Sequence, residues 1–130
     1  MAFVLDTAME PHSGPVAWKI AGKGEPIEIS FTAIFKRLTQ DGIKAMLTDI
    51  RITWEIEPET LTEAEKALEP KGKRELVLAV LAGWGDLNDS NGDPVPFSAA
   101  KIDKVLGIQG AEWAFIDSWV ASVSGANTKN

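Results

Sequence analysis

The chain contains no cysteine and a single histidine among its 130 residues. Without thiols it can build neither a disulfide scaffold nor a zinc–thiolate site, and it has no cysteine nucleophile. His12 alone cannot form a metal-binding cluster, and a histidine-based catalytic triad would have to be built around it. We expect His12 to be a surface residue beside Pro11. The sequence therefore predicts no metal and no cofactor, and a core that is held together by packing alone.

Long apolar runs and positive charge are also scarce. The longest nearly apolar run, residues 76–84, is far shorter than the roughly 20 residues that a membrane-spanning helix needs. Residues 1–10 contain neither a basic stretch nor an apolar segment of signal-peptide length. The formal net charge of -6 and the isoelectric point of about 4.8 disfavour contact with phosphate backbones and anionic lipid. We expect a cytoplasmic protein whose partners are proteins, with neither nucleic acid nor membrane among them.

The first third of the chain has the pattern of a β-hairpin. Residues 16–20 and 27–35 are rich in strand-forming residues, and the glycines and proline of residues 22–26 separate them as a loop. In the second strand, alternate residues are apolar, which predicts a sheet covered on one face only. These apolar residues are Ile27, Ile29, Phe31, Ala33 and Phe35.

Helical periodicity dominates the rest of the chain. A stripe at helical spacing follows the N-cap candidate Thr39, and it consists of Ile43, Met46, Leu47, Ile50 and Trp54. We predict further helices over residues 74–84, where Trp84 closes an apolar stripe and is expected to be largely buried, from Ser98 as N-cap to residue 106, and over 110–123. Residues 55–73 are charged and form either a connector with a short helix near 62–68 or an exposed stretch.

These segments predict the fold class. An apolar content of 45% in a chain of this length is enough for one modest core, so residues 1–130 are expected to form one domain. The predicted fold is α+β, with an N-terminal β-hairpin packed against about four α-helices.

None of the short motifs in the sequence matches a complete catalytic or ligand-binding pattern. Gly22-Lys23-Gly24 is followed by Glu-Pro instead of a third glycine and a helix, so it is interpreted as a hairpin turn. The acidic loop at residues 86–97 lacks the bidentate glutamate of a calcium loop. Ser98 and Lys101 match S-x-x-K without its partner motifs, and a helix cap explains Ser98 more simply. We expect a protein without enzymatic activity and without catalytic residues.

The aromatic residues point to binding. The chain has five tryptophans and five phenylalanines but no tyrosine. The last predicted helix carries more large apolar side chains than one buried stripe needs, which indicates either an exposed binding patch or a helix buried on two sides. The candidate partner-binding residues are Trp113, Phe115, Ile116 and Trp119. Phe115 and Trp119, four residues apart, are the best candidates for exposed anchors.

The order of several short segments resembles the tail assembly chaperones of long-tailed bacteriophages. The similarity covers nearly the whole chain, although residues 55–73 have no recognisable equivalent. The segments are Met1 to Asp6, the hairpin ending at residues 31–38, Leu81-Ala82-Gly83-Trp84, residues 91–98, Ile108-Gln109-Gly110, the helix with Ala114 to Trp119, and the terminal Lys129-Asn130.

The resemblance implies a protein of the host cell cytoplasm that binds the phage tape measure protein and helps to recruit tail tube subunits during assembly. It brings no catalytic residue and no established contact position to this chain. The alternative is a structural tail component, such as a tail tube or tail completion protein. The sequence leaves open whether the protein forms a homo-oligomer.

Overall fold

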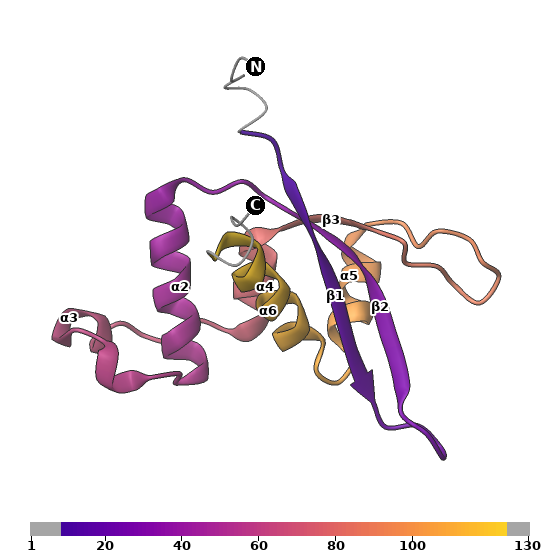
Figure 1. The fold of residues 1–130 in the computed structure, drawn as a ribbon, viewed down its shortest axis with the longest axis horizontal. Helices are drawn as coiled ribbons and strands as arrows, with labels where there is room; N and C mark the ends of the chain where they lie inside the picture. Colours follow the sequence, from indigo (N-terminus) through magenta and orange to yellow (C-terminus); the bar gives the residue numbers. More distant parts are fainter. Residues whose placement is uncertain (1–8, 125–130) are drawn as a thin grey trace.

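A three-stranded antiparallel sheet organises the fold, which is α+β. The computed structural model describes residues 9–124. The strands are β1 (His12–Ile20), β2 (Ile27–Phe35) and β3 (Leu81–Gly85), in the order β1-β2-β3. Figure 1 shows that β1 and β2 form a long hairpin, as the alternation of apolar residues predicted.

The hairpin buries one face. β2 has the predicted bounds, whereas β1 begins four residues earlier than predicted because residues 12–15 pair with the end of β2. Phe31, Ala33 and Phe35 are buried, and Val16 lies opposite Phe31 on the same face. The intervening residues of both strands face outward, so their backbone pairs while their side chains stay near solvent.

The third strand was not predicted. Residues 81–85 were expected to continue a helix to Trp84, but α4 (Lys73–Val80) ends at Val80. Lys36 donates its backbone N–H to the carbonyl of Val80 at 2.8 Å, and Trp84 pairs with Ala33 of β2. The free edge of β2 thus offers hydrogen-bond partners to the backbone of residues 81–85. Gly83 and Gly85 make a helix unfavourable in this segment.

Two of the remaining helices begin directly after the N-caps that the sequence predicted. The remaining helices are α2 (Gln40–Trp54), the single-turn 3₁₀ helix η1 (Pro58–Thr60), α3 (Glu63–Lys66), α5 (Ala99–Leu106) and α6 (Ala111–Val123). The side chains of Thr39 and Ser98 accept the N–H groups of Gly42 and Lys101, which confirms both predicted caps. Thr62 and Glu65 form a capping box at α3, so residues 55–73 contain the predicted short helix.

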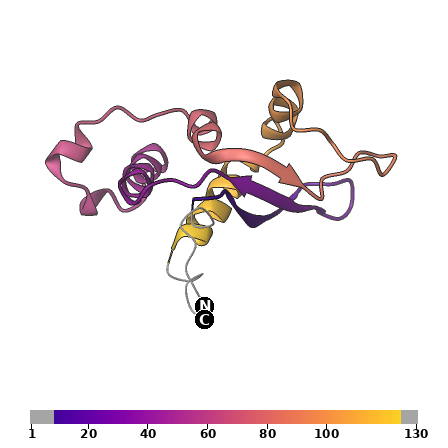
Figure 2. The same cartoon turned by 90° about the horizontal axis from the view of Figure 1, so that it is seen from above.

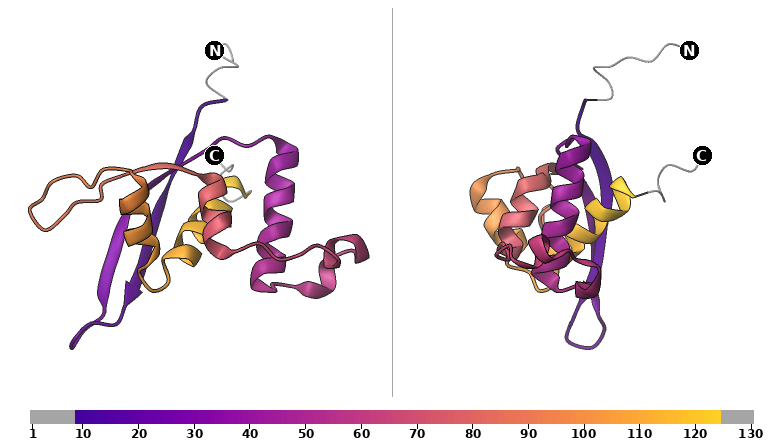
Figure 3. Two further views of the ribbon diagram at one scale, coloured as in Figure 1. Left: turned by 180° about the vertical axis from the view of Figure 1, so that it is seen from behind. Right: turned by 90° about the vertical axis from the view of Figure 1, so that its left-hand side faces the viewer.

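The helices are arranged around the hairpin unequally. In Figures 1 and 3, α2, α4 and α6 lie to one side of it, while the loop between β3 and α5 extends away on the other side. Figure 2 shows α3 beyond α2, far from the sheet. The buried apolar side chains form one cluster in which β2, α4 and α6 supply most of the large members, among them Phe35, Leu76, Phe115 and Trp119.

The first and last segments of the resemblance to phage proteins fall at the two ends of the chain. Met1 to Asp6 and Lys129-Asn130, which contribute to the phage resemblance, lie outside the described residues. Among residues 9–124, no helix has the length and apolar character needed to cross a bilayer.

His12 was expected to be a surface residue, but in the structure it is partly buried. The Ser122 hydroxyl donates to the Trp119 carbonyl at 2.6 Å, so the His12 Nε2–H donates to Ser122 Oγ at 2.9 Å. Nδ1 is then the unprotonated ring nitrogen, and it is buried without a hydrogen-bond partner in the described chain. Burial of the ring, helped by the positive charge of Arg37, lowers the pKa of His12.

This environment predicts a loss of stability in acid. The pKa of His12 is lower in the folded chain than the usual value of 6.5, so the unfolded state takes up the proton more readily. The stabilisation is complete above about pH 6.5 and is lost as the pH falls through the folded-state pKa. Urea denaturation should show that the free energy of unfolding falls less between neutral and mildly acidic pH in His12→Gln than in the wild-type protein. The amide of this glutamine can still donate to Ser122. Equal declines in both proteins would contradict this account.

Candidate functional site

The structure buries three of the four predicted binding residues and leaves one exposed. Phe115, Ile116 and Trp119 are each 0% exposed, whereas Trp113 is 40% exposed. The prediction that Phe115 and Trp119 are exposed anchors is therefore wrong. Of the four, only Trp113 can contact a partner without a rearrangement of α6.

The burial of α6 has a clear cause, because the helix packs between β1 and α4. Gly14 of β1 lies so close to α6 that a Cβ atom placed on it would be 2.8 Å from Ser118 Oγ. On the same side, the ring of Phe115 meets that of Phe31 at a centroid distance of 5.5 Å. A helix buried on two sides, the alternative left open by the sequence, is the arrangement found.

Trp113 faces away from these contacts and meets α2. Its ring lies 5.2 Å from that of Trp54, centroid to centroid, with the planes tilted by 57°. Lys73 Nζ lies 5.4 Å from the Trp54 ring centroid, within cation–π range. The pair therefore presents a half-exposed aromatic surface with one cation at its margin.

A groove opens beside this pair, between the C-terminal half of α2 and α6. Its volume is about 200 Å³, and we call it the Trp113 groove. Five of its lining residues are apolar and three are charged. The lining residues are Leu47, Ile50, Arg51, Ile56, Glu57, Trp113, Asp117 and Val120.

The end of α2 places Ile56 in this groove. Glu55 adopts a left-handed conformation, φ 54° and ψ 40°, and the N–H of Ile56 donates back to the Arg51 carbonyl at 2.9 Å. This is a Schellman ending, in which the chain reverses sharply after the helix. Glu57 is also left-handed, with φ 50°, so Ile56 lies between two turns of the backbone. Ile56 is consequently exposed beside Trp113 instead of entering the core.

Arg51 gives the groove an unused hydrogen-bond donor. Its Nε is buried and has no hydrogen-bond partner in the part of the chain that the structure describes. Glu57 and Asp117 line the same groove, yet Arg51 is not in the three salt bridges found among residues 9–124. Nε itself is too buried to be reached, so a carbonyl or carboxylate oxygen of a bound molecule would meet the terminal N–H groups of this guanidinium, which no salt bridge within residues 9–124 engages.

Two acidic segments of the described chain make local hydrogen bonds instead of gathering into a cluster. No group of three or more His, Cys, Asp or Glu side chains within residues 9–124 could hold a metal ion. Asp89 accepts the N–H groups of Asn91 and Asp93, which makes the acidic loop a polar turn. The N–H of Thr62 lowers the pKa of Glu65, so this carboxylate is an ionised helix cap.

Comparisons of the chain with protein-family models, with curated proteins and with solved structures found no match. The functional proposal therefore depends on the Trp113 groove and on the sequence resemblance. Sequence reasoning identified Trp113 but missed Arg51 and Ile56. A single isoleucine between two glutamates just after the α2 stripe was the available signal for Ile56.

Proposed function

We propose that the protein is a tail assembly chaperone of a long-tailed bacteriophage, which binds the tape measure protein and helps to recruit tail tube subunits in the host cytoplasm. The resemblance of the ordered segments supports the family, and the Trp113 groove supports a binding role. The observation that carries the binding role is Trp113 itself, 40% exposed on a helix whose Phe115 and Trp119 are fully buried.

The composition of the groove suits a helical partner. Tryptophan and arginine are the residue types that most often dominate binding energy, and here they lie beside Ile56 and Val120. An amphipathic helix could place one apolar side chain against Trp113 and offer a carbonyl or carboxylate oxygen to Arg51. A tape measure protein before tube closure is expected to be a long helical chain with apolar surface that would otherwise aggregate.

The test removes the aromatic anchor. Trp113→Ala should weaken binding of the co-expressed tape measure protein by about thirtyfold, the usual loss for a residue that contributes about 2 kcal/mol. Its stability should change by less than about 1 kcal/mol, because the side chain is already half in solvent. Co-purification and a titration with a purified tape measure fragment would measure binding, and urea denaturation would measure stability.

Leu78→Ala is the matched control. Leu78 is also 40% exposed, but it lies on α4 and outside the Trp113 groove. It should bind as the wild-type protein does. If Trp113→Ala binds normally, or if Leu78→Ala weakens binding equally, the Trp113 groove is not the docking surface.

A structural tail component is the second candidate, and the sheet edge favours it. In the described part of the chain β1 pairs with β2 alone, which leaves one edge able to accept a strand from a neighbouring subunit. A permanent component would be found in purified virions by mass spectrometry. A chaperone should be present in infected cells and absent from the virions.

A further inference from the structure

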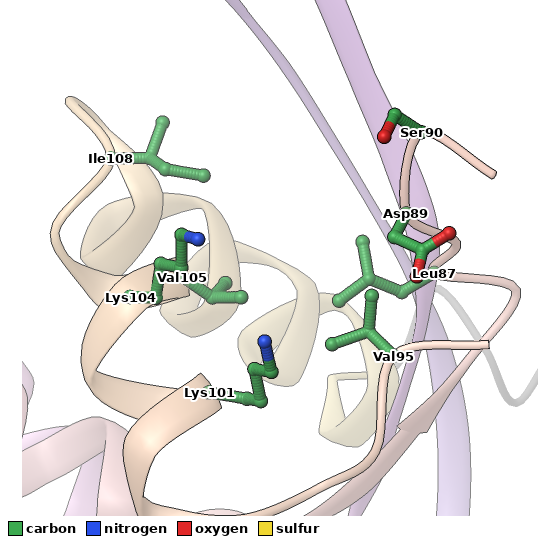
Figure 4. A pocket seen from close by; sticks show the side chains of 8 residues that line it. All are labelled: Leu87, Asp89, Ser90, Val95, Lys101, Lys104, Val105 and Ile108. Carbon is green, nitrogen blue, oxygen red and sulfur yellow. The ribbon is translucent and has the colours of Figure 1, made fainter. Parts of the chain in front are cut away.

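A larger cavity lies on the other side of the molecule, between α5 and the loop that follows β3. Its volume is about 420 Å³, within the range of sites that bind ligands. Figure 4 shows aliphatic side chains approaching it from both walls. We call it the α5 groove; it is lined by Leu87, Asp89, Ser90, Val95, Lys101, Lys104, Val105 and Ile108.

The loop wall of this groove is held in place by hydrogen bonds. The N–H of Val95 donates to the Leu87 carbonyl at 2.8 Å, and the N–H of Asp89 donates to the Asp93 carbonyl at 2.9 Å. The indole N–H of Trp84 donates to the Val95 carbonyl at 2.9 Å, which ties the loop to the core. The groove is thus preformed, so a ligand would not have to pay for ordering this wall.

The helix wall carries two lysines that have no ionic partner among the described residues. Lys101 and Lys104 are three residues apart on α5 and lie on the same side of it, and in Figure 4 Lys101 extends into the cavity. Neither is in a salt bridge within residues 9–124. Asp103, between them in sequence, is paired with Arg74 at 2.7 Å.

The carboxylate on the opposite wall forms no salt bridge with these lysines in the described part of the chain. Asp89 Oδ1 accepts the N–H groups of Asn91 at 2.8 Å and Asp93 at 3.0 Å, so it is engaged within its own turn. Lys101 is in the first turn of α5, where the helix dipole disfavours a cation and where no acidic residue is present. A lysine in the first turn therefore does not stabilise the helix, whereas it could pair with a negatively charged ligand.

We propose that the α5 groove binds a segment of a partner protein in which aliphatic side chains alternate with acidic ones. The aliphatic side chains would fill the space between Val95 and Val105, and the carboxylates would pair with Lys101 and Lys104. The charge of the chain strengthens the inference, since the groove lining holds two lysines against one aspartate, whereas the chain as a whole has a formal net charge of -6. This site is separate from the Trp113 groove and does not depend on the proposed function.

A displayed random peptide library, selected on the wild-type protein and counter-selected on Lys101→Glu/Lys104→Glu, would test the proposal. The expected peptides combine aliphatic residues with Asp or Glu. In fluorescence anisotropy, a selected peptide should bind the charge-reversed variant at least about tenfold more weakly. Its affinity for the wild-type protein should fall as salt is raised, because the lysines are partly exposed.

The control variant Lys19→Glu/Lys23→Glu makes the same change in net charge on the hairpin, away from the α5 groove, and should bind as the wild-type protein does. Exchanging the acidic residues of the peptide for lysine should restore binding to Lys101→Glu/Lys104→Glu. The proposal is overturned if no peptide is enriched, if the enriched peptides are neutral or basic, or if both variants bind equally. Decanoate is the probe for a fatty acid. If it binds and no peptide is enriched, the groove is assigned to a fatty acid instead.

Discussion

Trp119→Ala is expected to lower the free energy of unfolding by about 3–5 kcal/mol. Trp119 is 0% exposed and belongs to the core cluster, so its removal leaves a large cavity between elements that hold one another in place. Its indole Nε1 has no hydrogen-bond partner among the described residues, so the loss is one of packing. Because a domain of this size is stable by only about 5–15 kcal/mol, the effect should be plain in urea denaturation.

Trp113→Ala is the comparison on the same helix. It removes a side chain of the same size that is 40% exposed, so its cost should stay below about 1 kcal/mol. The two variants separate a structural tryptophan from a binding one. If Trp119→Ala were as stable as Trp113→Ala, α6 would not be buried in solution and the sequence-based assignment of Trp119 as an anchor would have to be reconsidered.

Trp84→Ala should cost a similar amount, about 3–5 kcal/mol, but with an additional local consequence. The side chain is 9% exposed and lies edge-on to Phe97 at a centroid distance of 4.9 Å. Its N–H donates to the Val95 carbonyl, so the substitution also frees one wall of the α5 groove. Urea denaturation would measure the global loss, and hydrogen exchange of the Val95 amide would measure the local one.

Trp84→Phe serves as the control because it keeps an aromatic ring but loses the indole N–H. Its cost should be smaller, and exchange at Val95 should still accelerate, since the hydrogen bond to the loop is absent. A Trp84→Ala protein with wild-type stability would show that this residue is exposed. Unchanged exchange at Val95 in both variants would show that the indole does not hold the loop.

The two grooves are placed so that both can be occupied at once. The Trp113 groove is formed by α2 and α6, and the α5 groove by α5 and the preceding loop. In Figures 1 and 2, α2 and α5 lie on opposite sides of the molecule. Two segments bound at the two proposed sites would therefore not compete with one another.

The sequence by itself determined the elements whose signals are local. Alternation from Ile27 to Phe35 specified β2 and the face that is buried from Phe31 to Phe35, although Ile27 at the start of this face is exposed. Thr39 and Ser98 marked helix starts, because a side-chain oxygen satisfies the free N–H groups of the first turn only a few residues away. The depth of Trp84 was also predicted correctly, although its strand was not.

Only the tertiary structure decided which apolar faces are covered. The pattern of α6 was compatible with one buried face or two, and the close approach of β1 at Gly14 and the contact with α4 settled it by burying Phe115 and Trp119. Residues 81–85 could extend a helix or pair with β2, and the free edge of β2 decided for the strand. Periodicity reports which side chains share a face, whereas burial depends on segments that are distant in sequence.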